Sequence, residues 1–137
     1  MLENPKVNIK IKLAALWTSV TLCYLYGDYF ELYTPDKVNS LITGENNLDS
    51  PIKLLIASII LAVSSVMVAA SIILKPKINR TLNILFGSLF TIMMVLIGIF
   101  STNGWYLFYV FLAFLESIIT ALIVWFAWKW PKEKSKL

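Results

Sequence analysis

Six side chains in this sequence could do chemistry, and Glu116 is the most informative of them. It lies in an apolar run, eleven residues after Trp105, which places it about 16 Å along a helix at ~1.5 Å per residue. An acidic side chain near the middle of a bilayer costs about 2.5 kcal/mol or more if it faces lipid. We therefore expect Glu116 to face other helices, a subunit interface or a water-filled cavity.

Tyr109 and Thr120 share the helical face of Glu116 by their three- and four-residue spacing, at one or two turns' distance. Both carry hydroxyl groups that could form hydrogen bonds with the carboxyl group. Two interpretations stay open for this group of residues. One is an ion, proton or ligand site, and the other is a polar clasp that holds helices together.

A second group lies near the outer end of the first apolar run. Asp28 and Glu31 are acidic, and Tyr24 lies one helical turn before Asp28. These residues would either form an acidic mouth that gathers cations or an amine, or act as interfacial acids that hydrogen-bond tyrosine and cap the following loop.

The chain offers little for catalysis or metal binding. Histidine is absent and Cys23 is the only cysteine, which excludes an intrachain disulfide and ordinary His/Cys metal sites. Neither Glu116 nor Asp28 has a nearby His, Lys or second deep carboxylate in the sequence to complete a catalytic pair. We expect no catalytic residues, no metal and no cofactor. The chain has a single Arg and no Arg-rich patch, which argues against nucleic acid as a partner.

The elements that must position these residues are four apolar runs, each about as long as a helix needs to cross a bilayer. Hydrophobic residues make up 58% of the chain, well above the 45–50% that is usual in soluble domains. We predict an all-α protein, an integral membrane four-helix bundle, in a single transmembrane domain 1–137. The predicted spans are 11–32, 51–74, 81–100 and 105–130, with an outer loop at 33–50.

Local signals set the ends of these spans. Asp49 or Ser50 should cap the second helix, with Pro51 in its first turn. Pro76 should end that helix, and Asn79 or Thr81 should cap the third. A short amphipathic helical turn is possible from Asp36 to Ile42 within the outer loop.

Basic residues predict the orientation. Ten of the twelve Lys and Arg residues lie before the first span, between the second and third, or after the fourth. Only Lys37 and Lys53 lie on the other side. The positive-inside bias therefore places both termini in the cytoplasm. Aromatic residues cluster at the predicted span ends and are typical of membrane interfaces, although an aromatic-lined outer pocket is an alternative.

Small residues suggest close helix packing. The second span carries Ser58, Ala62, Ser65 and Ala69 on one side, and the third carries Gly87, Thr91 and Gly98. We favour packing inside one bundle, with an oligomer interface as the alternative.

Three stretches carry a resemblance to a known family: Ala15–Pro35 with its Gly27-Asp28-Tyr29-Phe30 segment, Leu74–Ile84, and Ile123–Pro131. The chain resembles an uncharacterised family of small four-span bacterial membrane proteins, a domain of unknown function. That resemblance implies a multi-pass protein of the bacterial plasma membrane and no established activity. A looser likeness to DoxX-type membrane proteins rests on architecture alone.

Three functions remain open. The first is a binding or transport module for a small ligand or ion, acting as a homo-oligomer because four helices are few for a complete transport path. The second is a structural or regulatory subunit with a membrane partner protein. The third is a membrane-embedded lipid-modifying enzyme, for which the sequence gives least support; membrane lipid is a partner in every case.

Overall fold

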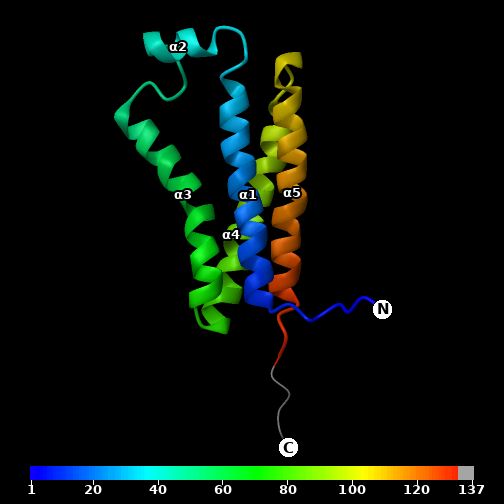
Figure 1. The fold of residues 1–137 in the computed structure, drawn as a ribbon. Coiled ribbons are helices and arrows are strands. Elements are labelled where there is room, and N and C mark those ends of the chain that lie inside the picture. Colours follow the sequence, from blue (N-terminus) through cyan, green and yellow to red (C-terminus); the bar gives the residue numbers. More distant parts are fainter. Residues whose placement is uncertain (133–137) are drawn as a thin grey trace, which may run out of the picture.

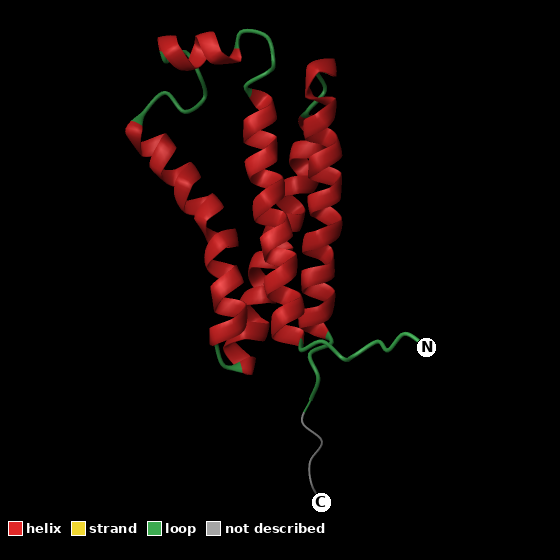
Figure 2. Cartoon of the chain, in the orientation of Figure 1, coloured by secondary structure: helices red, strands yellow, loops and turns green. Residues whose placement is uncertain are grey.

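The computed structural model describes residues 1–132 and consists of helices joined by short loops. No strand occurs in this part of the chain, so the all-α prediction is confirmed. The elements in order are α1 (Ile9–Glu31), α2 (Lys37–Thr43), α3 (Pro51–Ile73), α4 (Pro76–Phe100), the 3-10 turn η1 (Gly104–Tyr106) and α5 (Leu107–Trp128). Figure 2 shows how little of the chain is loop outside the N-terminal segment and the connections of α2.

The four long helices run side by side (Figure 1). Helix α1 packs against both α3 and α5, and α4 packs along α5. Helix α3 lies close to α1 near its C-terminal end and leans away toward its N-terminal end, where α2 bridges the gap (Figure 1). The two ends of the described chain and the α3–α4 connection all lie at the same end of the molecule.

Three of the long helices are long and apolar enough to cross a membrane: α3, α4, and α5 with its leading 3-10 turn. Helix α1 is as long as α3, at 23 residues, but it is not among the three. Its apolar run is interrupted by hydroxyl side chains, tyrosines and Asp28. Four apolar spans were expected, and three of the four long helices fulfil this expectation. Helix α1 does not, because it is more polar.

The helix starts follow the local chemistry, with one correction. Ser50 caps α3 by accepting a hydrogen bond from the Lys53 backbone N–H at 3.3 Å, and Pro51 occupies the first turn, as predicted. Helix α4 begins at Pro76, five residues before the predicted start at Thr81. Pro76 ends one helix and also begins the next, because its fixed φ and missing N–H suit a first turn.

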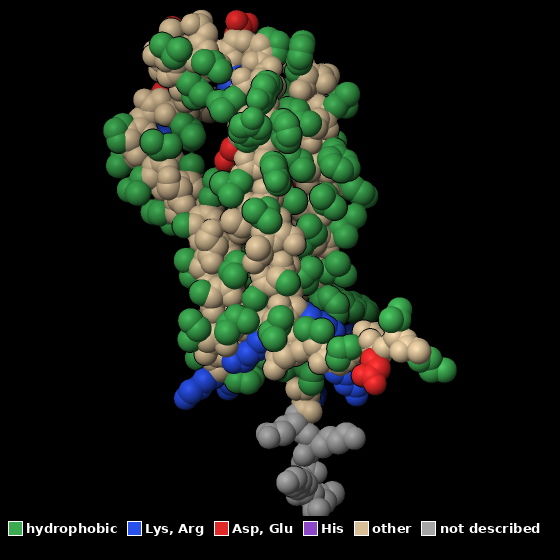
Figure 3. Space-filling view, in the orientation of Figure 1, with side chains coloured by type: hydrophobic (Ala, Val, Ile, Leu, Met, Phe, Trp, Pro, Cys, Tyr) green, Lys and Arg blue, Asp and Glu red, His purple; other side chains and the backbone are tan. Residues whose placement is uncertain are grey.

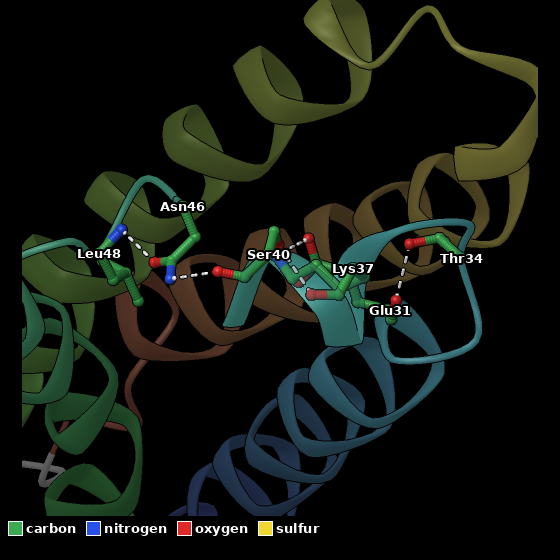
Figure 4. Close-up of polar contacts among 6 residues, drawn as sticks. All are labelled: Glu31, Thr34, Lys37, Ser40, Asn46 and Leu48. Atoms are coloured by element: carbon green, nitrogen blue, oxygen red, sulfur yellow. Dashed lines mark hydrogen bonds and ion pairs between the residues drawn. The ribbon is translucent and has the colours of Figure 1, made fainter. Parts of the chain in front are cut away.

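The outer connection is held by its own polar contacts (Figure 4). The Lys37 ammonium group lies 2.7 Å from the Glu31 carboxylate, and the Thr34 hydroxyl donates to the Glu31 carbonyl oxygen at 2.8 Å. Further along, the Asn46 side chain donates to the Ser40 carbonyl oxygen at 3.4 Å. These contacts join the end of α1 to α2, which confirms the predicted helical turn in this loop.

A buried polar network ties α1, α3 and α4 together near the basic end. The Trp17 indole N–H donates to Asn83 Oδ1 at 2.8 Å, and the Asn83 amide donates to Asn79 Oδ1 at 2.7 Å. Asn79 in turn donates to the Ser71 carbonyl oxygen at 2.6 Å. Asn79 is fully buried inside α4, so the prediction that it caps this helix is wrong, as is the one for Thr81, which lies beyond the first turn.

Two basic side chains bind the carbonyl groups at the ends of neighbouring helices. Lys10 donates to the carbonyl oxygens of Ile72 and Leu74 at 3.1 and 2.7 Å, at the end of α3. Arg80 donates to the Ala127 carbonyl oxygen at 3.1 Å, at the end of α5. Cations are stabilising there because the last carbonyls of a helix lack partners and carry partial negative charge.

The two small-residue faces behave differently. On α4, a Cβ added at Gly87 would lie 2.9 Å from Val124 Cγ2, and one added at Gly98 would lie 3.6 Å from the Ala113 side chain. This face therefore packs on α5, as predicted. On α3 the predicted stripe is exposed, because the inward face is formed by Ser64, Met67 and Ser71. The prediction that it packs inside the chain is wrong.

Candidate functional site

A cavity of about 220 Å³ lies between the four long helices. Most of its wall is apolar, and the polar groups that reach it come from α1 and α5. It is lined by Cys23, Tyr24, Gly27 and Asp28 of α1, Ala57, Ile60 and Leu61 of α3, Met93, Met94 and Ile97 of α4, and Tyr109, Leu112, Ala113 and Glu116 of α5. Four of the six predicted site residues therefore meet at one cavity.

Glu116 is the most buried of the polar groups in the cavity, with 3% of its surface exposed. Among the described residues its carboxyl group has neither an ion pair nor a hydrogen bond. Only its backbone carbonyl is engaged, as the acceptor of the Thr120 hydroxyl at 2.8 Å. The carboxyl oxygens are not among the fully buried unpaired atoms, so the carboxyl group faces the cavity, and these contacts do not form the interhelical clasp considered for Glu116.

Tyr24 places a second unsatisfied group at the cavity. Its ring packs near Phe90, with the ring centroids 5.9 Å apart. Its hydroxyl oxygen is buried and has no hydrogen-bond partner within the described chain. Most buried polar groups in proteins are paired, so the unpaired Tyr24 hydroxyl is an exception, and it belongs to a residue that lines the same cavity as Glu116.

Asp28 and Tyr109 complete the polar part of the lining. Asp28 is exposed and lies toward the open side, whereas Glu116 lies at the buried end. Helices α1 and α5 lie close together here, because a Cβ built at Gly27 would lie 3.7 Å from the Tyr109 ring, an ordinary van der Waals contact. Helical periodicity predicts the faces of each helix but not which faces meet, so it does not by itself place Asp28 of α1 at the same cavity as Glu116 of α5.

Two of the predicted site residues lie elsewhere. Thr120 is fully buried, but its hydroxyl is engaged with the Glu116 backbone and with the Thr91 hydroxyl, 2.8 Å away. Glu31 is paired with Lys37 and organises the loop after α1. The predicted hydrogen bond from Thr120 to the Glu116 carboxyl group is therefore not formed, and Glu31 matches the loop-capping interpretation.

A second cavity, of about 170 Å³, lies between α1 and α3 and shares Tyr24, Asp28 and Leu61 with the first. Its remaining lining includes Ser58 and Ala62 from the exposed small-residue stripe of α3. Figure 3 shows a hollow on this side of the molecule with an acidic side chain at its edge. The space around Glu116 is thus adjacent to an opening on the flank of the molecule.

The aromatic-lined outer pocket that the sequence left open also has a counterpart. A separate cavity of about 270 Å³ lies near the outer ends of α1 and α5. It is lined by Phe30, Tyr33, Thr34, Trp105 and Phe108. It has no charged residue in its lining, so it offers less for specific recognition than the inner cavity.

The groups that line the inner cavity are suited to non-covalent recognition. Within residues 1–132, no three His, Cys, Asp or Glu side chains come together in a way that could hold a metal ion. Two carboxyl groups, two tyrosines and an apolar wall can recognise a small molecule with a polar and an apolar part.

The fold and the site define a small helical protein. Three of its helices are long and apolar enough to cross a membrane, and its helices surround a mostly apolar cavity with a few polar side chains in the lining. The chain belongs to the family of unknown function DUF6326, whose sequence model matches residues 4–136. The uncharacterised family that the sequence motifs indicated is thereby confirmed. No curated protein and no solved structure matches the chain.

Proposed function

We propose that this protein is a multi-pass protein of a bacterial plasma membrane that binds or transports a small ligand or ion in the cavity around Glu116. In this proposal α1 crosses the membrane with α3, α4 and α5 as a four-helix bundle, and both termini are cytoplasmic. Large hydrophobic side chains are exposed along α3, α4 and α5, as expected of helices that face lipid. Basic side chains gather at the end where the two chain ends lie (Figure 3).

The observation that carries the proposal is the unpaired Glu116 carboxyl group in the wall of a cavity. An acidic side chain between helices destabilises the fold when its carboxyl group has no hydrogen-bond or ion-pair partner. Such a residue is therefore not expected if its role is only structural. Intramembrane ionisable groups generally mark ion, proton or ligand sites. The polar character of α1 has the same explanation, because this helix supplies Tyr24 and Asp28 to the cavity.

Access is proposed from the side, between α1 and α3. Helix α3 leans away from α1 over the half that lines the cavity (Figure 1), and Ile60 and Leu61 are exposed there. A small molecule could therefore reach Glu116 from the outer half of the bilayer. For transport the proposal also requires a homo-oligomer, because four helices provide few surfaces for a complete path.

The proposal is tested in proteoliposomes that contain a pH dye and carry an imposed membrane potential. We expect a proton or cation flux that Glu116→Gln abolishes, since this change keeps the shape and removes the acid. Glu45→Gln is the matched control, because Glu45 lies exposed in the outer loop and its loss should leave the flux unchanged. The proposal would be overturned if the folded wild-type protein and the folded Glu116→Gln variant both showed no flux and also did not differ in ligand binding.

A structural or regulatory subunit is the second candidate, and one observation favours it. The small residues of α3, Ser58, Ala62, Ser65 and Ala69, lie exposed, and such faces let another helix approach closely in lipid. Purification of the protein as a stable, symmetric particle without other chains would count against this candidate. No contact in the structure favours the lipid-modifying enzyme.

A further inference from the structure

We propose that the ligand of the inner cavity is a small organic cation, whose charged end binds between Asp28 and Glu116 while its apolar part rests on the surrounding wall. This inference depends on the proposed function, because it names the class of ligand for the same cavity. It is carried by the charges, the burial and the wall chemistry of the lining residues.

Two acidic side chains, Asp28 and Glu116, line the cavity, and no basic side chain is among its lining residues. Among residues 1–132, Lys37 and Lys53 are the basic residues of the outer connection and the start of α3, and each is paired, with Glu31 and Asp49 respectively. A cation entering the cavity would therefore meet two carboxyl groups and would stabilise their ionised forms, whereas an anion would oppose that ionisation and a neutral molecule would leave both without a counter-ion.

The depth of the two acids suggests a route for the charge. Asp28 is exposed and is shared by both cavities, and Glu116 is 3% exposed at the buried end of the inner one. An approaching cation would meet Asp28 first and Glu116 second. Coulombic attraction strengthens as the surroundings lose water, so the deeper carboxyl group should contribute more to affinity.

The apolar lining of the cavity favours a cation that also has an apolar group. A hard inorganic ion such as Ca²⁺ prefers about six to eight oxygen ligands, and residues 1–132 hold no cluster suited to a metal. The cavity instead offers Ile60, Met93, Met94, Ile97 and Leu112. The rings of Tyr24 and Tyr109 are also in the lining, and aromatic faces attract organic ammonium groups.

The size of the site sets the size of the ligand. A volume of about 220 Å³ equals roughly seven water molecules at ~30 Å³ each. This suits a compact ammonium compound, and a longer apolar tail could extend into the second cavity past Leu61.

The test compares probes of one shape and different charge. Purified protein in nanodiscs is equilibrated with radiolabelled choline, a compact quaternary ammonium ion. Dimethylbutanol, the neutral isostere in which carbon replaces the ammonium nitrogen, and the anion dimethylbutanoate are used as competitors. We expect choline to bind at least about ten-fold more tightly than either competitor. Glu116→Gln should remove most of this preference, Asp28→Asn part of it, and Glu45→Gln none.

The outcomes separate this inference from the proposed function. If dimethylbutanol or dimethylbutanoate binds as tightly as choline, and Ala57→Phe abolishes that binding by filling the cavity, the cavity is a ligand site but the cation class is wrong. If none of the three probes binds to folded protein, the cation class is also wrong, and the flux experiment alone decides the proposed function. A choline preference that survives Glu116→Gln and Asp28→Asn would overturn the inference as well.

Discussion

Polar side chains inside this protein fall into two kinds. Those near the basic end are satisfied, as in the chain of hydrogen bonds from Trp17 through Asn83 and Asn79 to Ser71. Those around the inner cavity are not, since the Glu116 carboxyl group and the Tyr24 hydroxyl have no partner in the described chain. The first kind joins helices to one another, and the second is the basis of the proposed binding site.

The satisfied network leads to a prediction for Trp17. Trp17→Phe keeps an aromatic ring beside Phe90 but removes the indole donor 2.8 Å from Asn83 Oδ1. Loss of a partner from a buried polar group costs about 1–3 kcal/mol, so the thermal midpoint in detergent should fall. Trp105→Phe is the control, because Trp105 is 63% exposed. Equal midpoints for both variants would mean that the network does not stabilise the fold.

For single residues, the sequence predicted the chemistry of the side chain better than the neighbours that it contacts. Glu116 could be recognised because an acid in an apolar run is conspicuous. Asn79 is predicted as a helix cap, because polar side chains near a span end usually lie at the interface, but it is fully buried, as is Asn83. Their burial depends on the inward face of α3, which the pattern of small residues assigned to the wrong side.

Among the helices, α1 is distinguished by lying between α3 and α5 while being the least apolar of the long four. Its length and limits were predicted to within two residues, as were those of α3, because capping residues and prolines are local signals. The lean of α3 away from α1 has no such local signal. The lean lies at the end where α2 connects α1 to α3 (Figure 1), on the side of the cavity between α1 and α3.

The contact of α4 with α5 gives a second prediction. Gly87→Ala would place a Cβ 2.9 Å from Val124 Cγ2 and 3.3 Å from Ile123 Cγ2, both on stiff β-branched side chains. Overpacking of this kind costs about 1–3 kcal/mol. Gly98→Ala on the same helix meets only an ordinary 3.6 Å contact and should be neutral or stabilising. Circular dichroism on heating compares them, and a Gly87→Ala variant as stable as Gly98→Ala would contradict the packing.

The proposed entrance gives a third prediction. Ala62 lines the second cavity and is exposed, so Ala62→Phe should obstruct passage between α1 and α3. It should slow the reaction of Cys23, which lines the inner cavity, with a small thiol reagent by several-fold. Ala69→Phe, on the same exposed stripe but outside both cavities, should have no effect. Equal rates in the two variants would place the entrance elsewhere.

The whole molecule has a clear asymmetry of charge. Lys10, Lys12, Lys75, Lys77 and Arg80 lie at the end that holds both chain ends, and two of them bind the last carbonyls of α3 and α5. The same basic residues thus stabilise helix ends and favour the cytoplasmic side. The guanidinium group of Arg80 is engaged with the carbonyl oxygens of Ala127 and Trp128 at the end of α5.

This asymmetry predicts the topology. In a background where Cys23 is replaced by Ala, an impermeant maleimide added to intact cells should label Asn47→Cys in the outer loop and should not label Lys6→Cys before α1. After the cells are opened, both should be labelled. Labelling of Lys6→Cys in intact cells would reverse the proposed orientation or show that α1 does not cross.

The most direct test of the cavity uses Cys23, the only cysteine of the chain, as a reporter in its wall. Three small methanethiosulfonates, one cationic, one neutral and one anionic, are reacted with the folded protein, and each rate is divided by that for Cys23→Ala/Asn47→Cys. We predict that the cationic reagent is favoured over the anionic one by about ten-fold or more, and that Glu116→Gln with Asp28→Asn removes this preference. Equal normalised rates for all three reagents, or no reaction of Cys23 while the outer-loop cysteine reacts, would contradict an accessible cavity whose carboxyl groups select cations.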